Sequence, residues 1–391
     1  MTDSTTQLST PGALPPLSLY VHIPWCVRKC PYCDFNSHAQ RDTSLPEEAY
    51  IDALIRDLTF ELQRQVTQRP LHSIFIGGGT PSLFSAPSFE RLLTTIDQLM
   101  GISADTEITL EANPGTFEQI KFAGFKAAGI NRLSLGIQSF NDIQLKALGR
   151  IHSAENAMTA AKSAIQLFDR VNLDLMHGLP QQTTAGALAD LHQAISLGPE
   201  HLSWYQLTLE PNTEFHARPP TLPVDEALWE IQEAGQQHLA QAGFRQYEIS
   251  AYARHQAMSR HNLNYWTFGD YIGIGAGAHG KVSYRSDEGL RIERHEKLRQ
   301  PKAYLNAINP TQKRQWVAQE ELPFEFMLNA LRLYDGVSID LFEQRTGLSL
   351  QQLQKPLTLA RGKGLLMDNP DRLAPSAQGR LFLNDLLEIF L

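Results

Sequence analysis

The three cysteines of this chain stand close together, in the stretch Cys26-Val-Arg-Lys-Cys30-Pro-Tyr-Cys33. At these spacings three thiolates can face one point if the backbone loops around it. Disulfides explain them poorly, because the number is odd and one thiol would be left over. A structural zinc site normally has four ligands, and neither His22 nor His38 completes a recognised zinc spacing. A [4Fe–4S] cluster held by three thiolates fits better, because it leaves one iron open for a substrate.

This spacing resembles the signature of the radical S-adenosylmethionine (SAM) enzymes. In that family the open iron takes the amino and carboxylate groups of SAM, and an electron from the cluster splits the sulfonium. The resemblance therefore implies two cofactors: a [4Fe–4S] cluster on Cys26, Cys30 and Cys33, and SAM beside it.

The elements that would position this loop alternate between strand and helix patterns. Predicted strands cover residues 17–23, 73–76, 107–112, 132–138, 171–176 and 201–209, and amphipathic helices lie between them. Such repeats favour an α/β fold with parallel strands and right-handed crossovers, either a barrel or an open doubly wound sheet. Six repeats are too few for a closed eightfold barrel. The radical SAM resemblance implies a partial (β/α)6 barrel.

The chain divides into four predicted parts. Residues 1–16 are polar and are expected to form a loose tail, and residues 17–215 form the partial barrel. Residues 216–318 form a linking region, whose basic portion, 281–318, carries nine Lys and Arg against four Asp and Glu. That portion is expected to be a solvated connector, the alternative being a surface for haem propionates or anionic lipid. Residues 319–391 form a mostly helical, winged-helix-like domain, with a small β wing near 364–373.

Composition excludes several functional classes. The formal charge is −8 and the pI about 5.9, which gives no general attraction to nucleic acid. The winged-helix-like part carries seven Lys and Arg against ten Asp and Glu, so the basic surface of a DNA-binding domain is missing. The start lacks the pattern of a signal peptide, and no apolar run approaches the roughly 20 residues of a membrane helix. A cytoplasmic protein is expected, where thiolates stay reduced.

Polar or glycine residues stand at the carboxyl ends of most predicted strands, where a barrel of this kind carries its site. The second strand ends in Gly77-Gly78-Gly79-Thr80. Glycines let the backbone approach a ligand closely, and their free N–H groups can receive an acid group. After a strand, in a chain with this cysteine motif, the turn resembles the segment that binds the SAM amino group. Gly78, Gly79 and Thr80 are therefore predicted SAM contacts.

Further strand ends supply chemically useful side chains, and these extend the resemblance. An unpaired carboxylate such as Asp174, inside an apolar strand, would be unstable without partners. Each residue alone could be a hydrogen-bonded structural group. Together they resemble the SAM-contacting positions of the oxygen-independent coproporphyrinogen III oxidases. The matching residues are Tyr20, Tyr32, Glu111, Gln138, Arg150 and Asp174.

The chain departs from the oxidase pattern in two places. The oxidases carry a fourth cysteine where Phe35 stands here, and they have a longer N-terminal arm. Instead, His261-Asn262-Leu263-Asn264-Tyr265-Trp266 resembles the haem-binding HNxxYW motif of the oxidase-like haem chaperones. The resemblance implies a haem ligand at His261, with Tyr265 and Trp266 packing on the porphyrin. Rival haem ligands are His22, His177 and His279, and a buried structural role is the alternative for His261.

Two functional hypotheses follow from the resemblance. The first is a haem chaperone that hands haem to acceptor haemoproteins, membrane-bound respiratory cytochromes among them, with peripheral contact to the membrane. The second is a radical SAM enzyme that acts oxidatively on coproporphyrinogen III or a related tetrapyrrole. Phe35 and the short N-terminus disfavour the second, and His261 favours the first.

Overall fold

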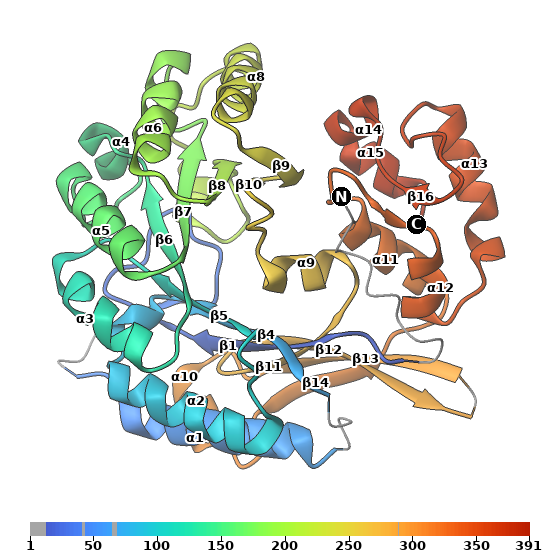
Figure 1. Cartoon of the computed structure of the whole chain (residues 1–391), viewed down its shortest axis with the longest axis horizontal. Helices are drawn as coiled ribbons and strands as arrows, with labels where there is room; N and C mark the ends of the chain where they lie inside the picture. The colour runs from blue at the N-terminus through green and yellow to red at the C-terminus, as the bar shows by residue number, and fades with distance from the viewer. Residues whose placement is uncertain (1–12, 41–43, 65–68, 288) are drawn as a thin grey trace.

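The structure is a computed structural model that describes residues 13–40, 44–64, 69–287 and 289–391. Most of the predicted N-terminal tail, residues 1–12, lies outside the described residues. One curved twelve-stranded sheet dominates the fold, with helices on its outer face and a helical domain beside its concave face (Figure 1). The strands run in the spatial order β14-β13-β12-β11-β1-β4-β5-β6-β7-β8-β10-β9.

The six predicted strands are confirmed and form the parallel centre of this sheet. Each pairs in parallel with the next along the chain, from β1 to β8. The strands are β1 (Leu17–Ile23), β4 (Leu71–Gly78), β5 (Glu107–Ala112), β6 (Arg132–Gln138), β7 (Arg170–His177) and β8 (His201–Gln206). Because their carboxyl ends all lie at one rim, the side chains that follow them converge there.

The helices between these strands cover the outside of the sheet, as Figure 1 shows. They bury apolar stripes; in α1, for example, Ile51, Leu54 and Leu58 are fully buried. The helices are α1 (Glu47–Leu62), α2 (Ala86–Met100), α3 (Thr116–Ala127), α4 (Asp142–Ala147), α5 (Ala154–Leu167) and α6 (Thr184–Leu197). A short 3-10 turn, η1 (Pro81–Leu83), follows the Gly-rich segment.

The predicted linking region continues the sheet at both edges. At one edge, after α7 (Glu214–Ala217) and α8 (Asp225–Gln241), β10 (Ala251–Ala253) pairs antiparallel with β8, and β9 (Arg245–Glu248) pairs antiparallel with β10. At the other, β11 (Asp270–Ile274) pairs in parallel with β1, and β12 (His279–Ser286), β13 (Gly289–Lys297) and β14 (Thr311–Trp316) follow in antiparallel order. α10 (Pro301–Asn306) lies between the last two. The predicted domain limits stay predictions.

The solvated connector expected at 281–318 is wrong for the residues described there, because much of it forms these paired strands. Lys297 is fully buried, with its Nζ atom 2.5 Å from carboxylate oxygens of both Asp57 and Glu61 on α1. Lys281 is buried against Asp270 at 3.0 Å. Two of the basic residues therefore neutralise buried carboxylates, and the local charge excess overstated the exposed positive surface.

The helix α9 (Arg260–Trp266), which holds the HNxxYW segment, lies on the concave side of the sheet (Figure 1). The ring of His261 packs against Phe75 of β4 and Tyr20 of β1, with ring centroids 5.1 and 6.5 Å apart. Since Tyr20 and Phe75 point inward from neighbouring strands, α9 fills the interior of the partial barrel.

The C-terminal part has its own hydrophobic core, around Phe326, Phe342 and Leu353. It contains α11 (Leu322–Ala330), α12 (Asp340–Thr346), η2 (Leu350–Leu353), α13 (Gln354–Gly362), α14 (Ala377–Leu381) and α15 (Leu383–Glu388). The predicted wing exists, since Leu366 bridges Pro375, and β15 (Val337–Ser338) pairs with β16 (Arg372–Leu373). The single last helix expected at 380–391 is instead α14 and α15, which break at Phe382. Among the described helices, none has the length and apolar character needed to cross a membrane.

Candidate cofactor site at the rim of the partial barrel

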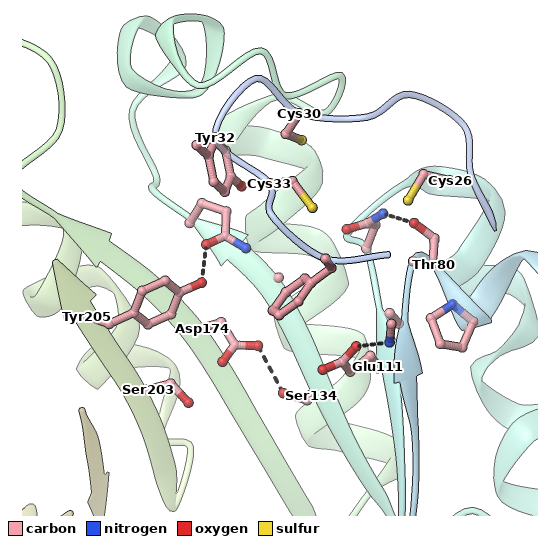
Figure 2. Close-up of a pocket in the computed structure, with 18 of the residues that line it drawn as sticks. Cys26, Cys30, Tyr32, Cys33, Thr80, Glu111, Ser134, Asp174, Ser203 and Tyr205 are labelled. Atoms are coloured by element: carbon pink, nitrogen blue, oxygen red, sulfur yellow. Dashed lines mark hydrogen bonds between the residues drawn. The ribbon is translucent and has the colours of Figure 1, made fainter. Parts of the chain in front are cut away.

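A cavity of about 340 Å³ lies at the carboxyl ends of the parallel strands, beneath the cysteine loop. It brings together every predicted site residue except Tyr20 and His261. The predicted residues that line it are Cys26, Cys30, Tyr32, Cys33, Gly78, Gly79, Thr80, Glu111, Gln138, Arg150 and Asp174. Figure 2 shows the three sulfur atoms at one side of this space and the two carboxylates deeper in it.

The cysteine loop leaves β1 and is held at its base by a short parallel pair, β2 (Trp25–Cys26) with β3 (His38–Ala39). All three cysteines are described, and none forms a disulfide. Cys26 is buried, while Cys30 and Cys33 are half-buried toward the cavity. Burial raises the pKa of the Cys26 thiol, so an uncompensated thiolate is disfavoured there. A group that supplies positive charge, such as iron, would reverse that preference.

The donor set fits a cluster better than a single metal ion. In the described part of the chain, no group of three or more Cys, His, Asp or Glu is arranged to hold one ion. The Arg150 Nη1 atom lies 3.6 Å from the Cys30 sulfur and brings a positive charge to the thiols. Soft thiolate ligands at the mouth of a cavity suit an iron–sulfur cluster with one exposed iron.

The Gly-rich turn is shaped by close contacts rather than by free N–H groups. Three of its N–H groups are bonded within the protein: that of Gly78 to Glu111 Oε2 at 3.0 Å, and those of Gly79 and Thr80 to backbone oxygens at 2.7 Å. The expectation that these N–H groups are free to receive an acid group of a ligand is therefore wrong for Gly78, Gly79 and Thr80. Gly78 has φ +113°, and a Cβ atom there would lie 2.5 Å from the His22 ring. Only glycine fits this position.

Two buried carboxyl groups, Glu111 of β5 and Asp174 of β7, face the cavity (Figure 2). Burial and, to a smaller extent, the nearby Asp174 together raise the pKa of Glu111 to about 7. Burial also raises the pKa of Asp174, although Ser134 and Asn172 donate hydrogen bonds to it at 2.9 and 2.8 Å. Because burial disfavours the charged form of both carboxyls, a bound cation would stabilise them, and the site therefore favours a positively charged ligand.

Gln138, at the end of β6, has a backbone conformation that few non-glycine residues adopt, with φ +67°. The pairing of β6 with β7 shifts register between Leu135 and Gln138, so the strand is irregular where it meets the cavity. The Tyr205 hydroxyl donates a 3.0 Å hydrogen bond to the Gln138 side-chain oxygen. A strained backbone that carries a fixed side chain at a cavity wall is a feature found often at binding sites.

Several lining residues were not predicted. Arg150 Nη2 donates to Asn113 Oδ1 at 2.7 Å, and Asn113 Nδ2 in turn donates to Thr80 Oγ1 at 2.9 Å. Strand alternation could have found Ser134, which shares the inward face of β6 with Gly136 and Gln138. Other unpredicted lining residues come from later segments of the chain and include Ser203, Tyr205, Glu248 and Arg332, whereas Trp266 was predicted only as a surface for haem.

His261 lies deep in the barrel and not on this cavity. It is 1% exposed, and both ring nitrogens are bonded, Nδ1 to Ser73 Oγ and Nε2 to Tyr265 Oη, each at 2.9 Å. Burial lowers the pKa of His261 to about 3, so the ring is neutral. Iron could reach a ring nitrogen only if one of these bonds broke. The arrangement matches the buried structural role that sequence analysis kept as the alternative.

The fold and this site define a radical SAM protein: residues 20–192 match the Radical SAM superfamily, and residues 317–382 match the HemN C-terminal domain. Membership of that superfamily implies a [4Fe–4S] cluster and SAM as cofactors. The chain is 52% identical to "Heme chaperone HemW" of Haemophilus influenzae and 50% identical to the protein of that name in Escherichia coli. The alignments cover 97% of this chain and 98% and 99% of those proteins. The chain belongs to the HemW family.

More distant proteins share the same architecture. The bovine mitochondrial "Radical S-adenosyl methionine domain-containing protein 1" is 36% identical over 95% of this chain and 86% of its own length. Among solved structures, coproporphyrinogen III oxidase (HemN) from Escherichia coli superimposes with a TM-score of 0.80, over 96% of this chain and 90% of that one. At 23% identity this likeness concerns the fold alone.

Proposed function

We propose that this protein is a haem chaperone, which binds haem together with a SAM-coordinated [4Fe–4S] cluster and hands the haem to acceptor haemoproteins. The observation that carries this proposal is the similarity, along almost the whole chain, to relatives named as haem chaperones. Membrane-bound respiratory cytochromes are the acceptors that the resemblance suggests. They would be reached by a cytoplasmic protein that touches the membrane peripherally.

In this proposal Cys26, Cys30 and Cys33 hold the cluster. A reduced cluster of this class supplies an electron to the sulfonium of SAM. Arg150 would place a positive charge 3.6 Å from the Cys30 sulfur, where a thiolate ligand of the cluster carries negative charge. Tyr32, which packs on Phe215 with ring centroids 6.3 Å apart, would hold the loop over the strand ends.

SAM would lie across the cavity, against the Gly-rich turn and the buried carboxyls. Glu111 and Asp174 would accept hydrogen bonds from its amine or hydroxyls, since their raised pKa values favour a bound cation. Gln138 and Thr80 would complete the polar wall. Tyr20, which does not line this cavity, is proposed to act from the layer beneath, because its hydroxyl bonds His22 Nδ1 at 2.9 Å next to Gly78.

The test separates the chaperone from the enzyme. Cluster-reconstituted protein is incubated without oxygen, once with haem and once with coproporphyrinogen III and SAM. We expect retention of about one haem per chain, its transfer to an apo-haemoprotein, and no change in the porphyrinogen. Conversion of coproporphyrinogen III with matching consumption of SAM would overturn the proposed chaperone function and favour the radical SAM enzyme.

The cluster has its own test. Cys26→Ala, Cys30→Ala and Cys33→Ala should each lose most of the roughly four irons per chain, because no other cysteine can replace the missing thiolate. Val27→Ala is the matched control, since Val27 lies in the same loop with 49% of its surface exposed. Full iron content in all three cysteine variants would refute the assignment.

A further inference from the structure

A second cavity, of about 450 Å³, lies next to the cofactor cavity. It is bounded by α9, β11, the start of β12 and the cysteine loop, and it reaches the C-terminal domain at Asn329 of α11. Phe35 and Trp266 line both cavities and so form a wall between them. Phe35 is 62% exposed, so its ring offers apolar surface at this wall.

Three histidines lie in or near the HNxxYW segment. In two of them, His261 and His22, both ring nitrogens are already hydrogen-bonded and are not free to bind iron. The two ring nitrogens of His261 are hydrogen-bonded to the hydroxyls of Ser73 and Tyr265. His22 is 4% exposed, with Nδ1 bonded to the Tyr20 hydroxyl and Nε2 to the Asn36 carbonyl oxygen, both at 2.9 Å. Using either as a metal ligand would break a buried hydrogen bond and leave its partner unsatisfied.

His279, the first residue of β12, differs from both. It lines the second cavity, its side chain is exposed, and its ring makes no hydrogen bond to any residue that the structure describes. Desolvation lowers the pKa of His279, the nearby Glu296 carboxylate opposes this, and Arg299 and Arg294 lower the pKa further, so the net shift favours the neutral imidazole. A neutral and unbonded imidazole is what haem iron requires of an axial ligand.

The backbone that carries His279 is held rigidly from behind. The N–H of Ala276 donates to the buried Tyr50 hydroxyl at 2.8 Å, and that of Gly275 to the Tyr304 hydroxyl at 3.0 Å. The N–H of Gly277 donates to the Leu298 carbonyl oxygen, and the Ala278 carbonyl oxygen accepts from the N–H of Lys297. A ligand mounted on such a segment is preorganised, because little backbone freedom is lost when it binds.

The rest of the second cavity suits a flat, partly apolar dianion. Tyr265, Trp266 and Tyr271 supply aromatic surface beside His279. The indole Nε1 of Trp266 is buried and has no hydrogen-bond partner within the described residues, so it is free to donate. Arg299 lines the cavity and is exposed, with a cation able to meet a carboxylate. Together these are an aromatic wall, an iron ligand and groups for propionates.

From these observations we infer that haem binds in the second cavity with His279 as its axial ligand, and that His261 supports the site from beneath by holding Tyr265. This inference rests on the proposed haem-chaperone function and assigns its binding residue. It places the haem against Phe35 and Trp266, on the other side of the wall from the cluster and SAM.

The test uses full-length protein with its cluster reconstituted, titrated with ferric haem without oxygen. His279→Ala should lose the spectrum of an imidazole-ligated haem and bind haem roughly tenfold more weakly or worse. Added imidazole should restore the spectrum, which a folding defect would not allow. His279→Met should bind haem with the altered spectrum of a thioether ligand. His255→Ala, an exposed histidine that lines neither cavity, is the control and should match the wild type.

The outcomes separate this inference from the proposed function. If wild-type protein binds no haem, the chaperone function itself fails. If wild-type protein binds haem and His279→Ala keeps its affinity and spectrum, the chaperone function stands and the assignment of His279 is wrong. Loss of the imidazole spectrum in His261→Ala but not in His279→Ala would give the ligand role to His261 instead. Under our inference, His261→Ala retains that spectrum.

Discussion

The guanidinium of Arg332, in the C-terminal domain, lies 4.2 Å from the centre of the Trp266 ring on α9. The same Arg332 pairs with the buried carboxylate of Glu248 on β9 at 3.3 Å. One side chain thus joins the C-terminal domain to the HNxxYW helix and to the edge of the barrel sheet. The domain therefore holds Trp266 in place at the wall between the two cavities.

Arg332→Ala should destabilise the protein by about 2 kcal/mol, because it removes the cation from Trp266 and leaves Glu248 unpaired. It should also speed haem release while iron content stays normal. Thermal unfolding and a haem-dissociation assay measure the two effects. The control is Arg245→Ala, since Arg245 pairs with Asp335 across the same two parts of the chain but both side chains are mostly exposed. Equal effects of the two variants would contradict the special role of Arg332.

SAM binding should strengthen as the pH rises. Glu111 has a pKa of about 7 in the free protein, so below that pH a cationic ligand must displace a proton, and above it the carboxylate is already charged. The affinity should rise about tenfold between pH 6 and pH 8. Equilibrium binding of SAM to cluster-loaded protein measures it.

Two variants test the source of this pH dependence. Glu111→Gln should bind SAM more weakly and flatten the rise, because the titrating group is gone. Asp174→Asn should move the rise to lower pH, since it removes the charge that helps to raise the pKa of Glu111. A wild-type protein whose SAM affinity is constant over this range would show that Glu111 does not meet the cation.

Gly78→Ala should destabilise the Gly-rich turn and weaken SAM binding. The added Cβ atom would meet the His22 ring at 2.5 Å, in a backbone conformation with φ +113°. Gly101→Ala is the matched control, since Gly101 also has positive φ, +78°, but nothing lies within 4 Å of its Cβ position. We expect a loss of about 1 kcal/mol for the control and roughly 3 kcal/mol for Gly78→Ala, by chemical denaturation. Equal losses would mean that the close contact with His22 is relieved easily.

Lys297→Met should destabilise the protein by about 3–5 kcal/mol, because it leaves the buried carboxylates of Asp57 and Glu61 without their shared cation. The loss should be largest at neutral pH, where both carboxylates would otherwise be charged. Lys313→Met, on the exposed side of β14, should change stability little. Denaturant titrations of both variants test this. Similar midpoints would argue against a structural role for the buried ion pairs of Lys297 with Asp57 and Glu61.

The sequence by itself determined the features that depend on local pattern. Cysteine spacing predicted the cluster loop, hydrophobic periodicity predicted the six parallel strands and their helices, and strand ends predicted the residues that meet at one rim. Glu111 and Asp174 come together for that reason, although 63 residues separate them in the chain. Parallel strands in one sheet bring their ends together whatever the length of the connections.

Only the tertiary structure decided what lies inside the barrel and which charges are buried. Motif matching pointed to His261 as a haem ligand, but α9 enters the barrel and Ser73, 188 residues away, bonds its ring. The basic stretch after β11 suggested a solvated connector, but Lys297 meets Asp57 across 240 residues. Such contacts depend on how whole surfaces pack, which no spacing within one segment encodes. The openness of His279 follows from the same packing, because Tyr50, Asp57 and Tyr304 of the core hold its loop in place.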